Sequence, residues 1–343
     1  MWSTESSFSY VEYSRLSPSA ASSSTTVQLP DSPNYQKDDD VQDVLSRGAA
    51  PLKAIYIAIV ETDDYPQCLM KQDDWDALTS HFGVDQGFVD TCVGDGFASE
   101  GKGKGNVRDG RVSFWNVSRV ARSDPSTQAT SFLQLGVFVT FDLITSSATY
   151  IAVLKGRDPV VMPCWYTPLP ADSPFEILAP TFKSVVQAWA LYFRAQDEVL
   201  SASEGSTATH PDSFDVWQIL SLSKVYIKCR AELRILERTL DFMVTEHEEY
   251  LGFRPASSYA GETVRSHHCQ AKRLIDQADC FLERINALKS IHLNQNALAN
   301  CHATKQVAQQ TKSLSQASTR DSISMRTIAA IQLCFLPAIF VSV

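Results

Sequence analysis

The sequence predicts an α+β fold, with a small sheet followed by long helices, and three observations support this class. Short runs rich in β-branched and aromatic residues, typical of strands, occur between residues 52 and 154. Apolar residues at helical spacing dominate the sequence after residue 175. The two kinds of segment do not alternate strictly, which favours segregated strands and helices over an alternating α/β fold.

Residues 1–50 are predicted to be a disordered tail. This segment is rich in Ser, Thr, Asp and Pro, and it cannot bury enough apolar surface to order itself. Ser17 and Ser32 each precede a proline and are candidates for phosphorylation, which would add negative charge to the tail. An unmodified tail is the alternative that the sequence leaves open.

An α+β domain with long helices is predicted over residues 51–261. Its first strand is expected at residues 52–60. A short helix is expected from Asp73, because acidic residues at a helix start interact favourably with the dipole. The Gly-rich segment 93–110 predicts a loop. Three further strands are expected, the last two paired as a hairpin, at residues 112–120, 132–141 and 149–154.

Three helices are expected in the second half of the chain. Two of them span residues 175–201 and 212–250, with a loop at 203–211 between them. The third begins near Thr263. Its apolar residues follow alternating spacings of four and three, which is the seam of a helix packed against other helices. The seam consists of Leu274, Ala278, Phe281, Ile285 and Leu288.

Beyond this seam the third helix turns polar, and residues 262–326 are predicted to form a stalk. The same count continues to His292 and Gln295, inside a stretch rich in Asn and Gln. A helix of about 60 residues would be ~90 Å long, which suits a stalk better than an ordinary globular helix. A solvated helix or a partly frayed linker is the alternative interpretation of its distal half.

Residues 327–343 are predicted to form a membrane helix. This run of about 17 residues has no ionisable side chain except the Cys334 thiol, and it is at the lower limit for crossing a hydrocarbon core of ~30 Å. Arg320 and Arg326 precede it, as the positive-inside rule expects of a cytoplasmic flank. A C-terminal apolar helix packed into a soluble core is the alternative, although the run offers few residues for a polar face.

The start of this apolar run has a characteristic spacing. Met325 is followed by Ile328 three positions later and by Pro337 twelve positions later. This pattern resembles the junction of stalk helix and first membrane helix in CorA-like magnesium transporters, especially their divergent fungal members. The resemblance implies that Met325 and Ile328 narrow a pore on its cytoplasmic side. It also implies that Ser322 and Ile339 line the pore where the family usually has polar residues, and that Pro337 adjusts the helix by removing one backbone donor.

In that family a Gly-Met-Asn signature and a second membrane helix follow, and both would lie beyond Val343. The resemblance therefore implies a chain truncated within its first membrane helix, which does not transport ions alone. It also implies a homo-oligomer, or association with a full-length relative, in which the polar stalk surrounds an axial channel. The alternative function is a non-transporting, membrane-anchored or soluble helical protein with an interaction or regulatory role.

Composition narrows the possible partners and compartments. The net charge of −9 argues against nucleic acid as the main partner, because phosphate contacts need clustered Lys and Arg. Eight cysteines without a Cys-x-x-Cys pair favour reduced thiols. The N-terminus has neither a basic leader nor an apolar core, so a secretory signal is not expected. We therefore predict a membrane protein with most of its chain in the cytoplasm.

One acidic cluster is a candidate site for a divalent cation such as Mg²⁺, as a transported or regulatory ion. Hard cations prefer oxygen ligands. The candidate ligands are Asp63, Asp64, Asp73 and Asp74. A solvated surface or a helix cap is the alternative for these residues.

The sequence contains no recognisable catalytic constellation, so neither an enzyme nor a resident cofactor is expected. The segment 96–102 has the spacing of a phosphate-binding loop, but Gly103 replaces the Ser or Thr that would hold Mg²⁺. His267, His268 and Cys269 are adjacent, and neighbours on a helix point in different directions, which disfavours a metal site.

Overall fold

The computed structural model describes most of the chain outside its N-terminal region. The described residues are 8–13, 45, 52–61, 66–68, 70–93, 102–104, 110–123, 130–156, 173–209, 216–253 and 258–341. In parts of some elements, including residues 334–341, only the backbone is described. The predicted α+β class is confirmed, because a sheet in the first half of the chain is followed by long helices.

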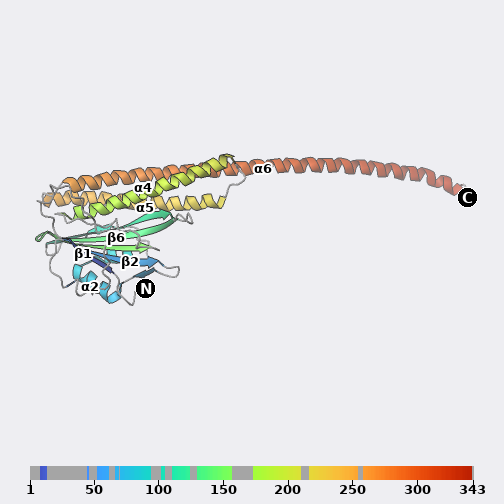
Figure 1. The fold of residues 1–343 in the computed structure, drawn as a ribbon. Coiled ribbons are helices and arrows are strands. Elements are labelled where there is room, and N and C mark those ends of the chain that lie inside the picture. Colours follow the sequence, from blue (N-terminus) through green and yellow to red (C-terminus); the bar gives the residue numbers. More distant parts are fainter. Residues whose placement is uncertain are drawn as a thin grey trace. The chain divides into compact units, whose positions relative to one another are not determined.

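A seven-stranded sheet is the centre of this fold (Figure 1). Its strands are β1 (Phe8–Tyr13), β2 (Leu52–Glu61), β3 (Pro66–Cys68), β4 (Lys102–Lys104), β5 (Arg111–Ser123), β6 (Thr130–Asp142) and β7 (Ser147–Gly156). The strand order is β1-β2-β7-β6-β5-β4, and β3 pairs with β2. β2 and β7 are parallel, whereas the other described pairs are antiparallel.

The predicted hairpin is formed by β6 and β7, with Phe138 opposite Ile151. Asp142 closes its turn, because its Oδ1 accepts hydrogen bonds from the backbone N–H groups of Ile144 at 2.8 Å and Thr145 at 3.0 Å. These backbone donors hold the pKa of the Asp142 carboxyl below its usual value. Ser146 follows in a left-handed conformation with φ of 53°, which a residue other than glycine rarely adopts. The hydrogen bonds of the Asp142 side chain stabilise this turn.

One face of the sheet is covered by α2 (Gln72–Phe82) and α3 (Gln86–Val93). The predicted short helix is α2, and it places Trp75 and Leu78 in the core. Gly136 on β6 lets α3 approach closely, because a Cβ there would lie 2.3 Å from Cys92 Sγ. The core on this face includes Ile55, Ile57, Trp75, Leu78, Phe88, Cys92, Trp115, Val117, Phe138 and Ile151.

The opposite face is covered by α4 (Pro174–Thr209) and α5 (Val216–Phe253), as Figure 1 shows. Tyr150 on β7 shares a hydrogen bond of 2.9 Å with Thr181 on α4. Trp189 Nε1 on α4 donates to the carbonyl of Arg119 on β5 at 3.0 Å. The Arg119 guanidinium in turn lies 3.1 Å from the buried Glu232 carboxylate on α5. Hydrogen bonds and one ion pair therefore fix both helices on the sheet.

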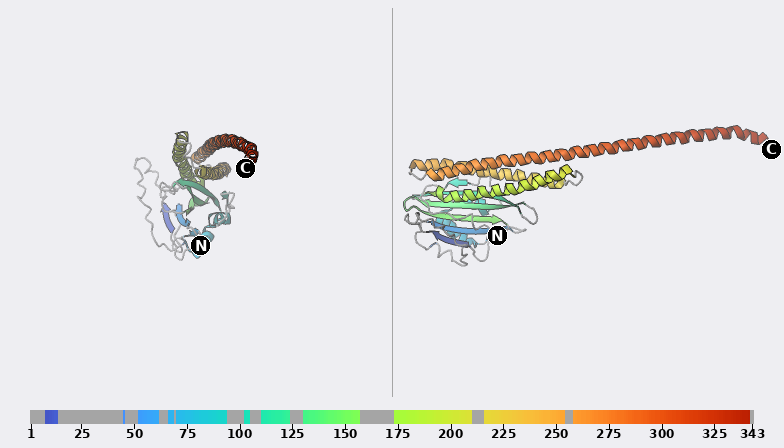
Figure 2. Two further views of the ribbon diagram at one scale, coloured as in Figure 1. Left: turned by 90° about the vertical axis from the view of Figure 1, so that its right-hand side faces the viewer. Right: turned by 45° about the horizontal axis from the view of Figure 1, so that its top comes forward.

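The last helix, α6 (Ser258–Val341), is described as 84 continuous residues. Its first turns run antiparallel to α5, since Arg230 pairs with Asp279 and Glu237 pairs with Lys272. Figure 2 shows the start of α6 beside α4 and α5, on the side of the sheet opposite α2. The sequence therefore predicted the helix correctly but placed its start near Thr263, about one turn late.

The chain divides into two compact units. The first contains Met1–Ala202 and Leu220–Glu283, and the second contains Ser203–Ile219 and Arg284–Val343. The sheet and the buried start of α6 belong to the first unit. The second unit contains the end of α4, the start of α5 and the rest of α6.

Four local expectations differ from the structure. Strand β1 lies inside the tail that was predicted to be disordered, while the rest of that tail, apart from Leu45, lies outside the described residues. The segment predicted as a loop over 93–110 contains β4. The loop expected at 203–211 is helical as far as Thr209, because α4 continues. In addition, α3 and the short strand β3 were not predicted. These elements are short or polar, so their own residues give little periodic signal.

Candidate functional site

The first half of α6 is held by a buried apolar seam. All five residues predicted for this seam are buried. The Phe281 ring, only 2 % exposed, has its centroid 5.6 Å from that of Phe193 on α4 and 5.2 Å from that of Tyr226 on α5. The seam continues for another turn, since His292 and Gln295 are partly buried. Aromatic packing of this kind contributes several kcal/mol, about 1.5–3 for burial of each large side chain.

The distal half of α6 has apolar residues on its surface. Every described side chain from residue 296 to residue 333 is exposed. Residues at a spacing of seven nevertheless form a row, which we call the distal seam: Leu293, Asn300, Val307, Leu314, Asp321 and Ile328. Its four apolar members are each more than half exposed. A seven-residue repeat keeps side chains on one face for association with another helix.

The residues predicted to line a pore lie at the end of this helix. Met325 is 73 % exposed and Ile328 is 57 % exposed, so neither packs into a core of the described chain. Ser322 is also exposed. Pro337 and Ile339 fall within the last turns of α6, and their side chains lie outside the described ones. The pore-lining roles remain predictions.

Among the helices that the structure describes, none combines the length and the apolar content needed to cross a membrane. The membrane helix over residues 327–343, whose side chains from 334 on are not described, remains a prediction.

The acidic cluster does not come together as a described site. Asp63 and Asp64 lie outside the described residues, and Asp73 and Asp74 occupy the first turn of α2. Carboxylates in a first turn interact favourably with the helix dipole, which accounts for this pair without a metal. Within the described segments, no group of three His, Cys, Asp or Glu side chains is placed to hold a metal ion.

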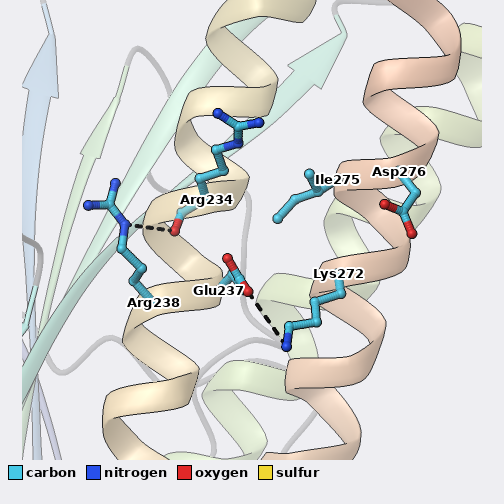
Figure 3. A pocket seen from close by; sticks show the side chains of 6 residues that line it. All are labelled: Arg234, Glu237, Arg238, Lys272, Ile275 and Asp276. Atoms are coloured by element: carbon cyan, nitrogen blue, oxygen red, sulfur yellow. Dashed lines mark hydrogen bonds and ion pairs between the residues drawn. The ribbon is translucent and has the colours of Figure 1, made fainter.

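A groove of about 550 Å³ lies between α5 and α6 in the first unit (Figure 3). It is lined by Arg234, Glu237, Arg238, Lys272, Ile275 and Asp276. Figure 3 shows Glu237 and Lys272 facing each other from the two helices, with 3.8 Å between Oε1 and Nζ. Arg238 Nε donates to the carbonyl of Arg234 at 3.3 Å, which directs this side chain along its own helix.

The charges of this groove belong to a row of ion pairs between α5 and α6. Arg230 and Asp279 lie 2.9 Å apart at one side of the groove, and Lys272 lies 3.8 Å from Glu237 across it. Exposed pairs of this kind contribute about 0–1 kcal/mol each. They fix the alignment of the two helices, and the groove offers no nucleophile with an adjacent base.

The buried thiols of the first unit are poorly suited to catalysis or metal binding. Burial raises the pKa of the Cys229 thiol to about 12, and burial also raises the pKa of the Cys92 thiol. A thiol must lose its proton to act as a nucleophile or a metal ligand. Both side chains therefore act as small apolar groups that fill the core.

Comparison with solved structures identifies proteins of similar fold, whereas comparison of sequences identifies no family. No protein-family model matches the chain. No curated protein matches it either.

Several solved structures do match. The soluble domain of CorA from Methanocaldococcus jannaschii is 13% identical with a TM-score of 0.50, over 71% of this chain and 89% of that one. The complete CorA magnesium transporter of the same organism is 12% identical with a TM-score of 0.51, over 76% of this chain and 74% of that one. The full-length CmaX protein is 11% identical with a TM-score of 0.51, over 89% of this chain and 81% of that one.

These matches confirm the CorA-like fold that the junction around Met325 predicted. At identities of 11% to 13%, the likeness concerns the arrangement of the backbone. The fungal type and the truncation within a membrane helix stay predictions. The distal seam was not among the predicted features, although the repeated spacing of seven through Leu293, Val307 and Leu314 was a signal for it.

Proposed function

We propose that this chain is a CorA-like, cation-transporter-related membrane protein whose α+β domain lies in the cytoplasm and whose α6 is the stalk of a homo-oligomer. The observation that carries this proposal is a CorA-like fold continuous with a helix of 84 residues. One matching protein is described as a magnesium transporter, so Mg²⁺ is the first ion to test. We do not propose an enzymatic activity.

The distal seam supports association between copies of the chain. An isolated helix in water gains little from propensity alone and is stabilised mainly by packing of its apolar face. Val307 and Leu314 provide such a face, and both are exposed in the single chain. A closed symmetric assembly would bury the same row from every copy.

The polar members of the same row suit a hydrated interior. Asn300 and Asp321 interrupt the apolar residues of the distal seam. Oxygen atoms of such side chains can replace part of the hydration shell of a divalent cation. In this proposal Met325 and Ile328 form an apolar constriction, Ser322 supplies polar contacts beside it, and residues 327–343 enter the membrane.

Association is tested by placing charges on the distal seam. The double variant Val307→Asp/Leu314→Asp puts carboxylates into the proposed interface, while Gln309→Asp/Gln316→Asp adds the same charges two positions away. Light scattering of the purified chain in detergent should give an oligomer for wild type and for the control, and a monomer for the seam variant. A monomeric wild type would contradict the proposal.

Ion conduction is tested in vesicles that contain a magnesium-sensitive dye. Met325→Ala should increase Mg²⁺ entry, because it widens the proposed constriction, while Ile323→Ala, at an exposed position outside the proposed constriction, should leave entry unchanged. An oligomer in the membrane without any ion flux would favour the non-transporting interaction or regulatory protein. A chain found in the soluble fraction after cell lysis would rule out the membrane-bound versions of both functions.

A further inference from the structure

His247 on α5 is enclosed by three helices. Its ring is only 2 % exposed and meets the Phe175 ring at the start of α4 edge to face, with centroids 5.1 Å apart. Gly261 at the start of α6 is in close contact, because a Cβ there would lie 2.6 Å from His247 Cε1. Nε2 of His247 has no hydrogen-bond partner among the described residues. The ring therefore fills a space between helices without an acceptor for an added proton.

His267 on α6 has a similar environment. It is 7 % exposed, and its Nδ1 lies 3.4 Å from Oε1 of Gln270 one turn further along the helix. Its Nε2, like that of His247, is buried without a hydrogen-bond partner in the described part of the chain. His247 on α5 and His267 on α6 are thus both packed as neutral rings near the start of α6.

The charged groups near these rings do not compensate for protonation. Arg265 on α6 faces His247, and Glu248 on α5 is already paired with Arg265. On the sheet side, Lys104 of β4 pairs with Glu246 and Glu249, the neighbours of His247 on α5. The contact from α4 is the uncharged Phe175, which precedes Glu176. Near His267, Lys183 on α4 repels a second positive charge.

We propose that His247 and His267 form a pH-sensitive lock that holds the start of α6 against α4 and α5 while both rings are neutral, and that loosens when they are protonated. A charged imidazolium in this space would be buried without an acceptor, which is costly. The inference rests on the first unit alone and is independent of the proposed transport function.

The electrostatic environment gives the direction of the effect. Burial lowers the pKa of His247 below its usual value of 6.5, and Arg265 lowers it further. Burial likewise lowers the pKa of His267, partly offset by Gln270. In the unfolded chain both rings titrate near 6.5. Their contribution to stability is therefore complete above that pH, and it is lost as the pH falls from there through the folded-state pKa values.

The test compares unfolding by urea between pH 7.5 and pH 5.0 for the full chain and for His247→Gln/His267→Gln. His302→Gln is the matched control, because His302 is an exposed histidine on the same helix. The dependence of stability on pH reports the protons taken up on unfolding. The double variant should take up fewer protons than wild type, by up to about two, and the control should match wild type. An identical pH dependence in the double variant and wild type would overturn the proposal.

A measurement on the wild type covers the case in which the double variant does not fold. Nuclear magnetic resonance of histidines labelled at Cε1, with signals assigned by substitution, should show that the rings of His247 and His267 titrate below pH 6.5. Amide exchange over residues 260–271, corrected for its intrinsic pH dependence, should rise on acidification while exchange in α2 does not. Titration of His247 and His267 at 6.5 or above, or unchanged exchange at the start of α6, would refute the lock.

Discussion

The two halves of α6 carry similar numbers of apolar residues per turn but have opposite surroundings. In the first half, Val264, Ala271 and Phe281 are buried, and Phe281 packs against rings of α4 and α5. In the distal half, Val307 and Leu314 are exposed, although they recur at the spacing of a helix interface. The difference teaches that apolar spacing identifies a face that can pack, while burial depends on whether the fold supplies a partner for that face.

The largest difference in stability is expected when one large apolar side chain is removed from each half of α6. Phe281→Ala should lower the free energy of unfolding by about 4 kcal/mol, because it leaves a cavity between two aromatic rings. Leu314→Ala should change it by less than about 0.5 kcal/mol, because this side chain is already in water. Urea denaturation of dilute full-length protein measures both. Equal losses would mean that the distal half is packed within the monomer.

A smaller effect is expected when a methyl group is added in each unit. Gly261→Ala should cost about 2 kcal/mol, because the new Cβ would lie 2.6 Å from His247 Cε1 and must displace it. Gly205→Ala on α4, in the second unit, should stabilise the protein by about 0.5 kcal/mol, since a Cβ there meets nothing within 4 Å and alanine favours the helix. Thermal unfolding midpoints should move in opposite directions. A loss at both positions would show that the second unit is packed as tightly as the first.

The smallest contrast concerns two arginines of α6. Arg284 in the second unit makes two hydrogen bonds of 2.8 Å to the Glu204 carboxylate, and this pair is partly shielded from solvent. Lysine cannot reproduce the two-pronged contact, so Arg284→Lys should cost about 1 kcal/mol. Arg265 and Glu248 are each more than half exposed, and Arg265→Lys should cost less than about 0.5 kcal/mol. Urea denaturation measures both losses in the free energy of unfolding. A larger loss for Arg265→Lys than for Arg284→Lys would contradict the expectation.

Strong periodic signals led to correct predictions of most long elements. The β-branched and aromatic runs predicted β5, β6 and β7, most of whose residues are buried, and the apolar faces predicted α4, α5 and the first half of α6. The edge strand β4 was not predicted, because its strand conformation depends on pairing with β5. Residues Lys102 to Lys104 pair with Asn116 to Phe114 on β5. Only glycine fits at position 103, because a Cβ there would lie 2.2 Å from Trp115 Nε1. No local pattern encodes such a contact.

The candidate site shows the same limit. The spacing of Met325, Ile328 and Pro337 led to a CorA-like fold, which the backbone comparisons confirm. The contacts of His247 could not be predicted from the sequence, because Phe175, His247 and Gly261 are far apart in the chain and meet only when three helices pack. The four aspartates looked like one cluster in the sequence, yet the two that the structure describes belong to a helix start.

The sequence by itself determined the fold class, the long helices and the row of residues at a spacing of seven, because backbone hydrogen bonding and side-chain periodicity are local properties. Only the tertiary structure decided which apolar rows are buried, which strands form the edges of the sheet, and which histidines lack an acceptor. These outcomes depend on contacts between residues distant in sequence, where the loss of water around one side chain is set by the shape of another.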